Sequence, residues 1–216
     1  MDPHPTTTPD EQGLDPAESL ALIEAQRARV RDAVEVDGRV IFAAWGVAWL
    51  VGYLALHATT RETAAGPSPS GLGFAVFGVL LAAALVTTVV HISRRTAGVR
   101  GESSRIGAML GLGWAVAFVT VFAVMAAVMR SEVADGPMAG VLANTIPCLV
   151  VGVLYLGQGA AWQERTQFAL GAWICLVTAA AAFVGVPDLY LVMALAGGGG
   201  FLVGAAAEQV LRGRRA

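Results

Sequence analysis

Small and polar residues recur every four positions in one long apolar stretch, and they are the best candidates for chemistry in this sequence. At this spacing one side of a helix carries Gly140, Asn144, Cys148 and Gly152. Pro147 lies beside them and frees a backbone carbonyl, and Gln158 follows near the end of the stretch. This polar stripe either lines a path for a solute or water, or packs with Asn144 hydrogen-bonded to a neighbouring helix.

A run of glycines in the last apolar stretch is the second candidate. It comprises Gly197, Gly198, Gly199 and Gly200, and Gly204 follows. Each glycine costs a helix about 1 kcal/mol relative to alanine, so the run indicates a need for close packing or irregular backbone. Gly200 and Gly204 would allow a close helix contact, including one across a homodimer. The alternative is a local break whose carbonyls face a cavity.

Ionisable side chains are missing from the middle of every apolar stretch, which disfavours a proton antiporter driven by carboxylates. His57 and His91 are predicted near opposite faces of the membrane, as pH sensors or as interfacial residues bonded to headgroups. Cys148 and Cys175 form no CxxC pattern, and no zinc-helix or phosphate-loop motif is present. The sequence therefore predicts no enzyme, no metal and no cofactor.

Six apolar stretches must position these residues. They cover residues 40–58, 72–92, 106–129, 138–157, 168–184 and 189–207. Each is close to the roughly 17 to 25 residues that a membrane helix needs. The chain is 56% hydrophobic and 14% charged, whereas soluble domains carry about 25% charged residues. We therefore predict an all-α membrane protein, a six-transmembrane-helix bundle over residues 38–210, with a turn rich in glycine and proline after the first span.

The arginines predict the orientation of the bundle. Twelve of the 14 basic residues, all arginine, precede the first span, lie in alternate loops or follow the last span, whereas Arg61 and Arg130 lie on the opposite side. Cytoplasmic loops are enriched in arginine and lysine, so both termini are predicted to be cytoplasmic, including a basic tail at 211–216. Heavy use of alanine, glycine, valine and arginine without lysine is typical of high-GC bacteria. We therefore expect a bacterial plasma membrane, with the lipid bilayer and not nucleic acid as partner.

The residues before the first span form two segments. Residues 1–14 are predicted to be a disordered tail because they contain little apolar surface to bury. Residues 15–37 are predicted to be a cytoplasmic amphipathic helix, since Asp15, Pro16 and Glu18 match a helix start. Its apolar stripe comprises Leu20, Ile23, Val30 and Val34. The stripe could bind the membrane surface, the bundle or a protein partner, or the helix could only lead into the first span.

A weak repeat divides the six spans into three hairpins. The first helix of each contains a tryptophan among small residues, namely Trp45, Trp114 and Trp173. Three tandem hairpins of the same orientation would explain the pattern. Coincidence would explain it too, because tryptophan is common near membrane interfaces.

The segment from Glu18 to Arg27, the Trp45-Gly46 pair and the stretch from Leu195 to Gly204 resemble uncharacterised six-helix integral membrane proteins of high-GC Gram-positive bacteria. The resemblance implies topology and a bacterial origin, and it supplies no residue role. Two functional hypotheses remain. The first is a homo-oligomeric transporter or channel-like bundle for a neutral or amphipathic solute. The second is an accessory or regulatory subunit that docks a membrane or cytoplasmic protein through its N-terminal helix.

Overall fold

A computed structural model describes residues 15–34, 36–64, 66–98, 100–130 and 136–213. The chain divides into two units, Met1–Glu35 and Val36–Ala216. In the first unit, helix α1 (Pro16–Val34) begins where Asp15 O accepts a hydrogen bond from Ser19 N. The predicted tail at 1–14 and the side chains of Val30 and Val34 lie outside the described part of the chain, whereas Leu20 and Ile23 are exposed on α1.

The second unit contains six helical segments that are long and apolar enough to cross a membrane, which confirms the predicted number of spans. The first five are α2 (Gly38–Thr59), α3 (Gly71–Arg95), α4 (Glu102–Val128), α5 (Pro137–Trp162) and α6 (Arg165–Val184). The sixth consists of α7 (Asp188–Val192), the π-helical turn η2 (Met193–Gly198) and α8 (Gly199–Gly213). The chain is therefore a multi-pass membrane protein by length and hydropathy.

Local sequence sets where several of these helices begin. Side chains of Asp37, Ser70 and Glu164 accept hydrogen bonds from the first backbone amides of α2, α3 and α6. Between α2 and α3 the sequence predicted only a turn, but the structure has a two-stranded antiparallel hairpin of β1 (Arg61–Thr63) and β2 (Gly66–Ser68). Gly66 has a φ of 98°, and its Cα faces Pro137 at the start of α5. The hairpin thus lies at the end of the bundle where α5 begins.

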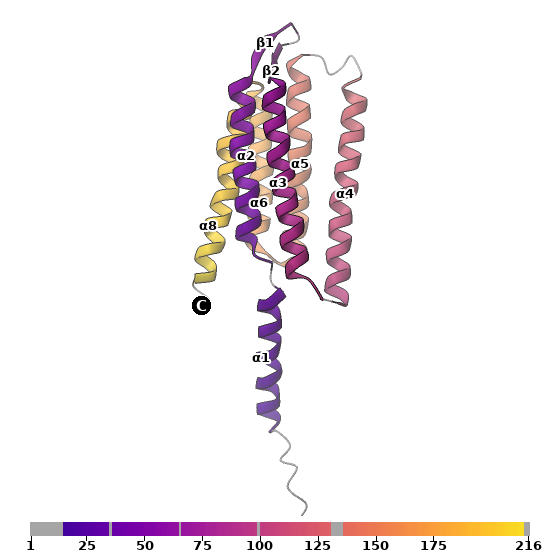
Figure 1. The fold of residues 1–216 in the computed structure, drawn as a ribbon, viewed down its shortest axis with the longest axis vertical. Coiled ribbons are helices and arrows are strands. Elements are labelled where there is room, and N and C mark those ends of the chain that lie inside the picture. The colour runs from indigo at the N-terminus through magenta and orange to yellow at the C-terminus, as the bar shows by residue number, and fades with distance from the viewer. Residues whose placement is uncertain (1–14, 35, 65, 99, 131–135, 214–216) are drawn as a thin grey trace, which may run out of the picture. The chain divides into compact units, whose positions relative to one another are not determined.

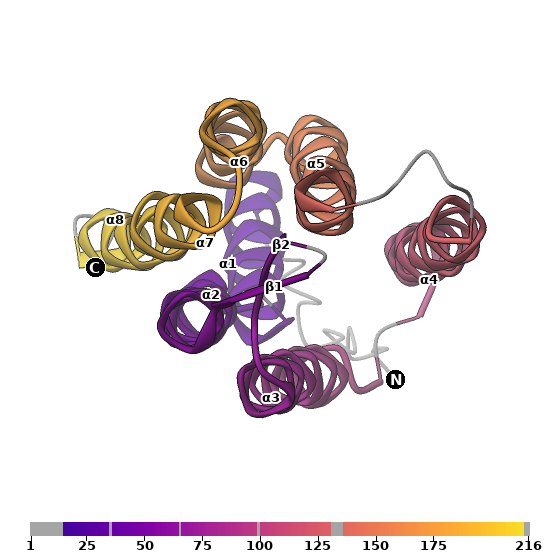
Figure 2. The same ribbon diagram turned by 90° about the horizontal axis from the view of Figure 1, so that it is seen from above.

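Figures 1 and 2 show how the spans of the second unit are arranged. Helix α2 packs against α3 and against the α7–η2–α8 span, while α6 packs against α5 and α8. Helix α4 contacts α5 and stands at the edge of the bundle. Consistent with this arrangement, only 11% of the apolar stretch in α3, and likewise in α4, is buried inside the bundle, compared with 44% for the last span.

Glycines bring two pairs of helices close together. A Cβ added at Gly159 on α5 would lie 2.5 Å from the backbone nitrogen of Phe168 on α6, and one at Gly171 on α6 would lie 2.6 Å from Leu156 N. A Cβ at Gly198 would lie 2.6 Å from Leu50 N on α2. Since lipid tails are as apolar as the side chains, such close van der Waals packing is a main source of helix association in membranes.

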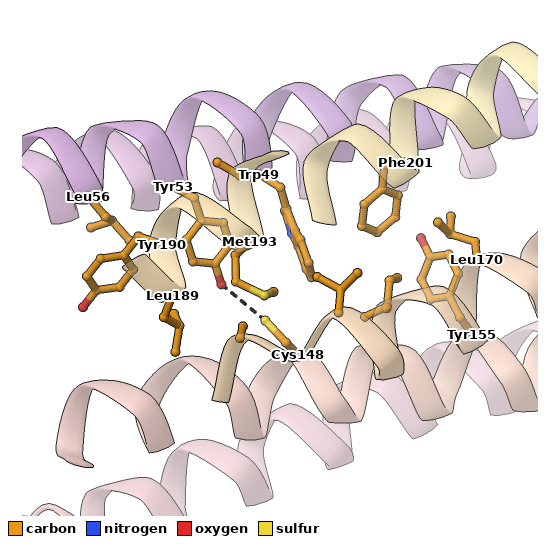
Figure 3. Packing of buried hydrophobic residues seen from close by; sticks show 14 of the residues in the cluster. Trp49, Tyr53, Leu56, Cys148, Tyr155, Leu170, Leu189, Tyr190, Met193 and Phe201 are labelled. Carbon is orange, nitrogen blue, oxygen red and sulfur yellow. Dashed lines mark hydrogen bonds between the residues drawn. The ribbon is translucent and has the colours of Figure 1, made fainter. Parts of the chain in front are cut away.

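The buried core lies between α2, α5, α6 and the last span (Figure 3). Several of its aromatic rings meet edge-on, as in Trp49 against Phe201 at 5.1 Å between centroids and Tyr155 against Phe201 at 5.8 Å. Such edge-to-face contacts favour one arrangement of the rings beyond simple burial. The polar stripe of α5 borders this core.

Candidate functional site

The polar stripe of α5 points toward the interior of the bundle. Cys148 is 4% exposed, and a Cβ added at Gly152 would lie 2.5 Å from Cys175 Sγ on α6. One added at Gly140 would lie 3.1 Å from Val186 Cγ1, between α6 and α7. The stripe therefore faces protein, as expected for a helix with Asn144 and Pro147 at mid-length.

Two tyrosines from other helices complete a buried polar cluster with this stripe. The Tyr53 hydroxyl on α2 lies 3.3 Å from Cys148 Sγ, in the hydrogen bond drawn in Figure 3. Tyr53 stacks on Tyr190 of α7 with ring centroids 6.5 Å apart, and each tyrosine is 2% exposed. The Asn144 amide donates to Gly140 O at 2.8 Å, and the Tyr190 hydroxyl lies 3.7 Å from where a Cβ of Gly140 would be. We call Tyr53, Asn144, Cys148 and Tyr190 the polar cluster.

A further buried hydroxyl lies at the same level. Thr178 on α6 is 4% exposed, and its Oγ1 has no hydrogen-bond partner among the described residues. Gly152 lies against Cys175, and Gly159 against Phe168. Because α5 and α6 run antiparallel, the same register places Thr178 of α6 opposite Leu149 of α5, which is the residue after Cys148. The unused donor and acceptor of Thr178 thus lie near the level of Cys148 along the bundle.

Pro147 interrupts the hydrogen bonding of α5 next to the polar cluster. Its nitrogen cannot donate to Ala143 O. One turn earlier, side chains bond to the helix backbone, since Thr145 Oγ1 donates to Val141 O at 2.8 Å, as Asn144 does to Gly140 O. Helix α5 continues through Pro147.

The glycine run lies in and just after the π-helical turn η2. The Trp173 indole of α6 donates to Ala196 O at 2.9 Å, and it occupies the place where a Cβ of Gly200 would be. On the other side, a Cβ at Gly197 would lie 3.0 Å from Trp49 Cε3. The glycine run thus has both close contacts and irregular backbone, and within η2 the Ala196 carbonyl is bound by the Trp173 indole.

The other glycines of this segment differ in their surroundings. A Cβ added at Gly199 would meet no described atom within 4 Å. One at Gly204 would make ordinary contacts of 3.6 Å with Leu170 Cδ2 and Phe42 Cδ2. Close approach in the last span is therefore concentrated at Gly197, Gly198 and Gly200.

The remaining sequence candidates lie away from the polar cluster. Gln158 accepts a hydrogen bond from Gln167 Nε2 at 2.8 Å, and it lies 14 positions from Asn144, which is about 21 Å along a helix. His57 Nδ1 lies 3.3 Å from Pro187 O, and His91 Nε2 accepts from Asp37 N at 3.2 Å at the opposite end of α2. Among the described residues, no three His, Cys, Asp or Glu side chains are grouped to hold a metal ion.

Sequence reasoning missed Tyr53, Tyr190 and Thr178. A signal for Tyr53 exists, because Trp49, Tyr53 and His57 are spaced by four and therefore share one face of α2. Tyr190 lies just inside the last span, where a tyrosine is expected at any membrane interface. Its stacking on Tyr53 depends on how α2 and α7 pack, which periodicity does not reveal.

The tryptophans of the weak repeat contact neighbouring helices in three different ways. Trp45 Nε1 on α2 donates to Thr88 Oγ1 on α3 at 3.0 Å. Trp114 on α4 meets Tyr155 on α5 edge-on at 5.8 Å, and Trp173 on α6 bonds the last span. Each tryptophan thus contacts the second helix of its own hairpin.

No protein-family model, curated protein or solved structure matches this chain. The resemblance to uncharacterised bacterial membrane proteins accordingly stays an expectation, and the role of each residue depends on the geometry above.

Proposed function

We propose that the bundle transports a neutral or amphipathic solute and that the polar cluster lies on its route. The observation that carries the proposal is a group of polar side chains in an otherwise apolar core, in which Tyr53, Cys148 and Tyr190 are buried and Asn144 is half-buried. Polar side chains inside membrane helices often mark substrate pathways. The cluster contains amide, hydroxyl and thiol groups but no carboxylate or amine, so an uncharged solute fits it best.

The described conformation is closed along the proposed route. Around the cluster, Gly140 meets Val186 and Gly152 meets Cys175, so α5 touches its neighbours above and below Asn144. Transport therefore requires α5 to move relative to α7. Pro147 and the π-helical turn η2 offer places for that movement, because both are common sites of kinks and functional irregularity in helices. On opening, the Thr178 hydroxyl would supply a donor and an acceptor to the solute.

The test is solute flux into liposomes that contain the purified chain. Glycerol, urea and a small sugar alcohol are suitable uncharged probes, and light scattering follows the resulting volume change. Asn144→Leu is expected to abolish the flux because it removes the amide from the cluster. Val153→Ala is the control, since Val153 is on the same helix and 54% exposed. If no solute enters faster than into empty vesicles, or if the two variants behave alike, the proposal is wrong.

We further propose that both termini face the cytoplasm of a bacterial plasma membrane and that the bundle is a homo-oligomer of three tandem hairpins per chain. The arginine asymmetry supports the orientation, and the contact of each tryptophan with the second helix of its own hairpin supports the repeat. Protease protection of tags fused to each end tests the orientation. Cross-linking in native membranes tests the oligomer, and monomers alone would contradict it.

A second candidate function is that of an accessory subunit. It is favoured by α1, which forms a unit of its own and exposes Leu20, Leu22 and Ile23 by 60%, 52% and 46%. Deletion of residues 1–36 separates the two functions. A transporter would keep its flux, whereas an accessory subunit would lose its protein partner in a pull-down from native membranes. We propose no catalytic role. Cys148 is the side chain of the polar cluster that could act as a nucleophile, but its Sγ is hydrogen-bonded to the Tyr53 hydroxyl and not to a general base.

A further inference from the structure

A polar network joins three helices at the end of the bundle where α2 begins. Asp37 bonds Arg39 at 2.6 Å, and the Arg39 guanidinium also donates to Gln209 Oε1 on α8. The backbone amide of Asp37 donates to His91 Nε2 near the end of α3. The network fixes the ends of α2, α3 and α8 relative to one another, independently of the polar cluster.

This network also determines which His91 nitrogen carries a proton. Because Nε2 accepts from Asp37 N, Nδ1 is the ring nitrogen that is left to donate. Nδ1 is therefore a hydrogen-bond donor with a fixed ring orientation.

Beside His91 the surface is hollowed by about 330 Å³. The hollow is lined by Val40, Val86, Thr87, Val90, His91 and Arg94. On α3, Val86, Val90 and Arg94 are spaced by four, so they follow one another along a single face. The result is an apolar track that ends in a guanidinium and an imidazole donor.

We propose that this hollow binds an anionic phospholipid of the leaflet at this end of the bundle. The phosphate accepts hydrogen bonds from Arg94 and His91 Nδ1, and one acyl chain follows Val90, Val86 and Val40. Charge complementarity supports this occupant, because the ion pairs formed within the described chain do not include Arg94 and arginine binds phosphate bidentately. The dimensions agree as well. From Arg94 to Val86 is about 12 Å of helix, close to the roughly 15 Å depth of one leaflet's hydrocarbon.

The experiment is a titration of the full chain, in neutral detergent, with a fluorescent short-chain phosphatidylglycerol and with the matching phosphatidylcholine. Phosphatidylglycerol is expected to bind at least about tenfold more tightly, as one charge-assisted hydrogen bond would give. Arg94→Gln should remove that preference. Arg95→Gln is the matched control, because Arg95 is the next residue of α3 and does not line the hollow. Equal loss in both variants, or equal binding of the two lipids, would overturn the proposal.

Two further measurements distinguish a lipid from a free phosphate compound. Val86→Trp fills the apolar track without touching the charge and should weaken lipid binding, while glycerol phosphate and inorganic phosphate at millimolar concentration should not displace the lipid. Displacement by the soluble phosphates together with unchanged binding by Val86→Trp would show a site for a free anion, contrary to the proposal. If Arg94→Gln fails to fold, Arg94→Lys keeps the charge and is expected to bind phosphatidylglycerol while Val86→Trp does not.

Discussion

The contact between α5 and α6 predicts a large difference between two identical substitutions two residues apart. A Cβ introduced by Gly159→Ala would lie 2.5, 2.7 and 2.8 Å from N, Cα and Cβ of Phe168. Ordinary contacts begin near 3.4 Å, so the helices would have to separate by about 0.9 Å. Two of the three obstructing atoms belong to the backbone, so a rotamer change cannot remove the clash. At Gly157 the same Cβ would meet no described atom within 4 Å.

These geometries set the expected magnitudes. Overpacking of this kind costs about 1 to 3 kcal/mol, whereas an exposed Gly→Ala change in a helix stabilises by up to about 1 kcal/mol. Gly159→Ala should therefore be roughly 1 to 3 kcal/mol less stable than Gly157→Ala. Reversible unfolding in mixed micelles, followed by tryptophan fluorescence, measures the difference. Equal stability of the two variants would refute the claim that α5 and α6 meet with backbone contact at Gly159.

Three other predictions follow from described contacts. A double-mutant cycle of Tyr53→Phe and Cys148→Ala should give a coupling free energy of roughly 0.5 to 1.5 kcal/mol in the same unfolding assay; additive effects would contradict the hydrogen bond between them. Trp173→Phe should destabilise the bundle by at least about 1 kcal/mol, because it leaves Ala196 O without its indole donor, while the same change at Trp162, which is similarly exposed (47% against 44%) but donates to no other helix among the described residues, should have little effect. Gly200→Leu should prevent assembly of the bundle, since its side chain would occupy the position of the Trp173 indole; a monodisperse, normally stable variant in size-exclusion chromatography would contradict this.

The number of spans could be predicted because bilayer thickness acts on each stretch independently of the rest of the chain. Five of the six predicted stretches lie within a candidate span, and the third extends one residue beyond Val128. The unexpected elements depend on interactions between segments. The hairpin of β1 and β2 forms where Gly66 lies against Pro137, a residue far along the chain. The spacing of residue types along the sequence does not reveal that contact.

The candidate site was accessible to sequence reasoning only in part. The spacing of Asn144 and Cys148 identifies one polar face because both residues are on the same helix. Their partners Tyr53 and Tyr190 come from α2 and α7, and it is the packing register of three helices that brings them together. The π-helical turn was similarly beyond reach, since the glycines indicated irregular backbone or close packing without saying that Trp173 would stabilise it.

Because α4 stands at the edge of the bundle, this helix should accept many different apolar sequences. The side chains that α4 buries include Val121 and Met125, while Met109, Val119 and Phe122 are 66%, 69% and 62% exposed. Lipid distinguishes poorly among such apolar side chains, so exchanges of leucine, isoleucine, valine and methionine along that surface should be nearly neutral. In a saturation mutagenesis library, the exposed positions of α4 would thus tolerate many apolar residues, whereas the buried positions of α6, such as Ile174 and Ala181 at 0% exposure, would tolerate few.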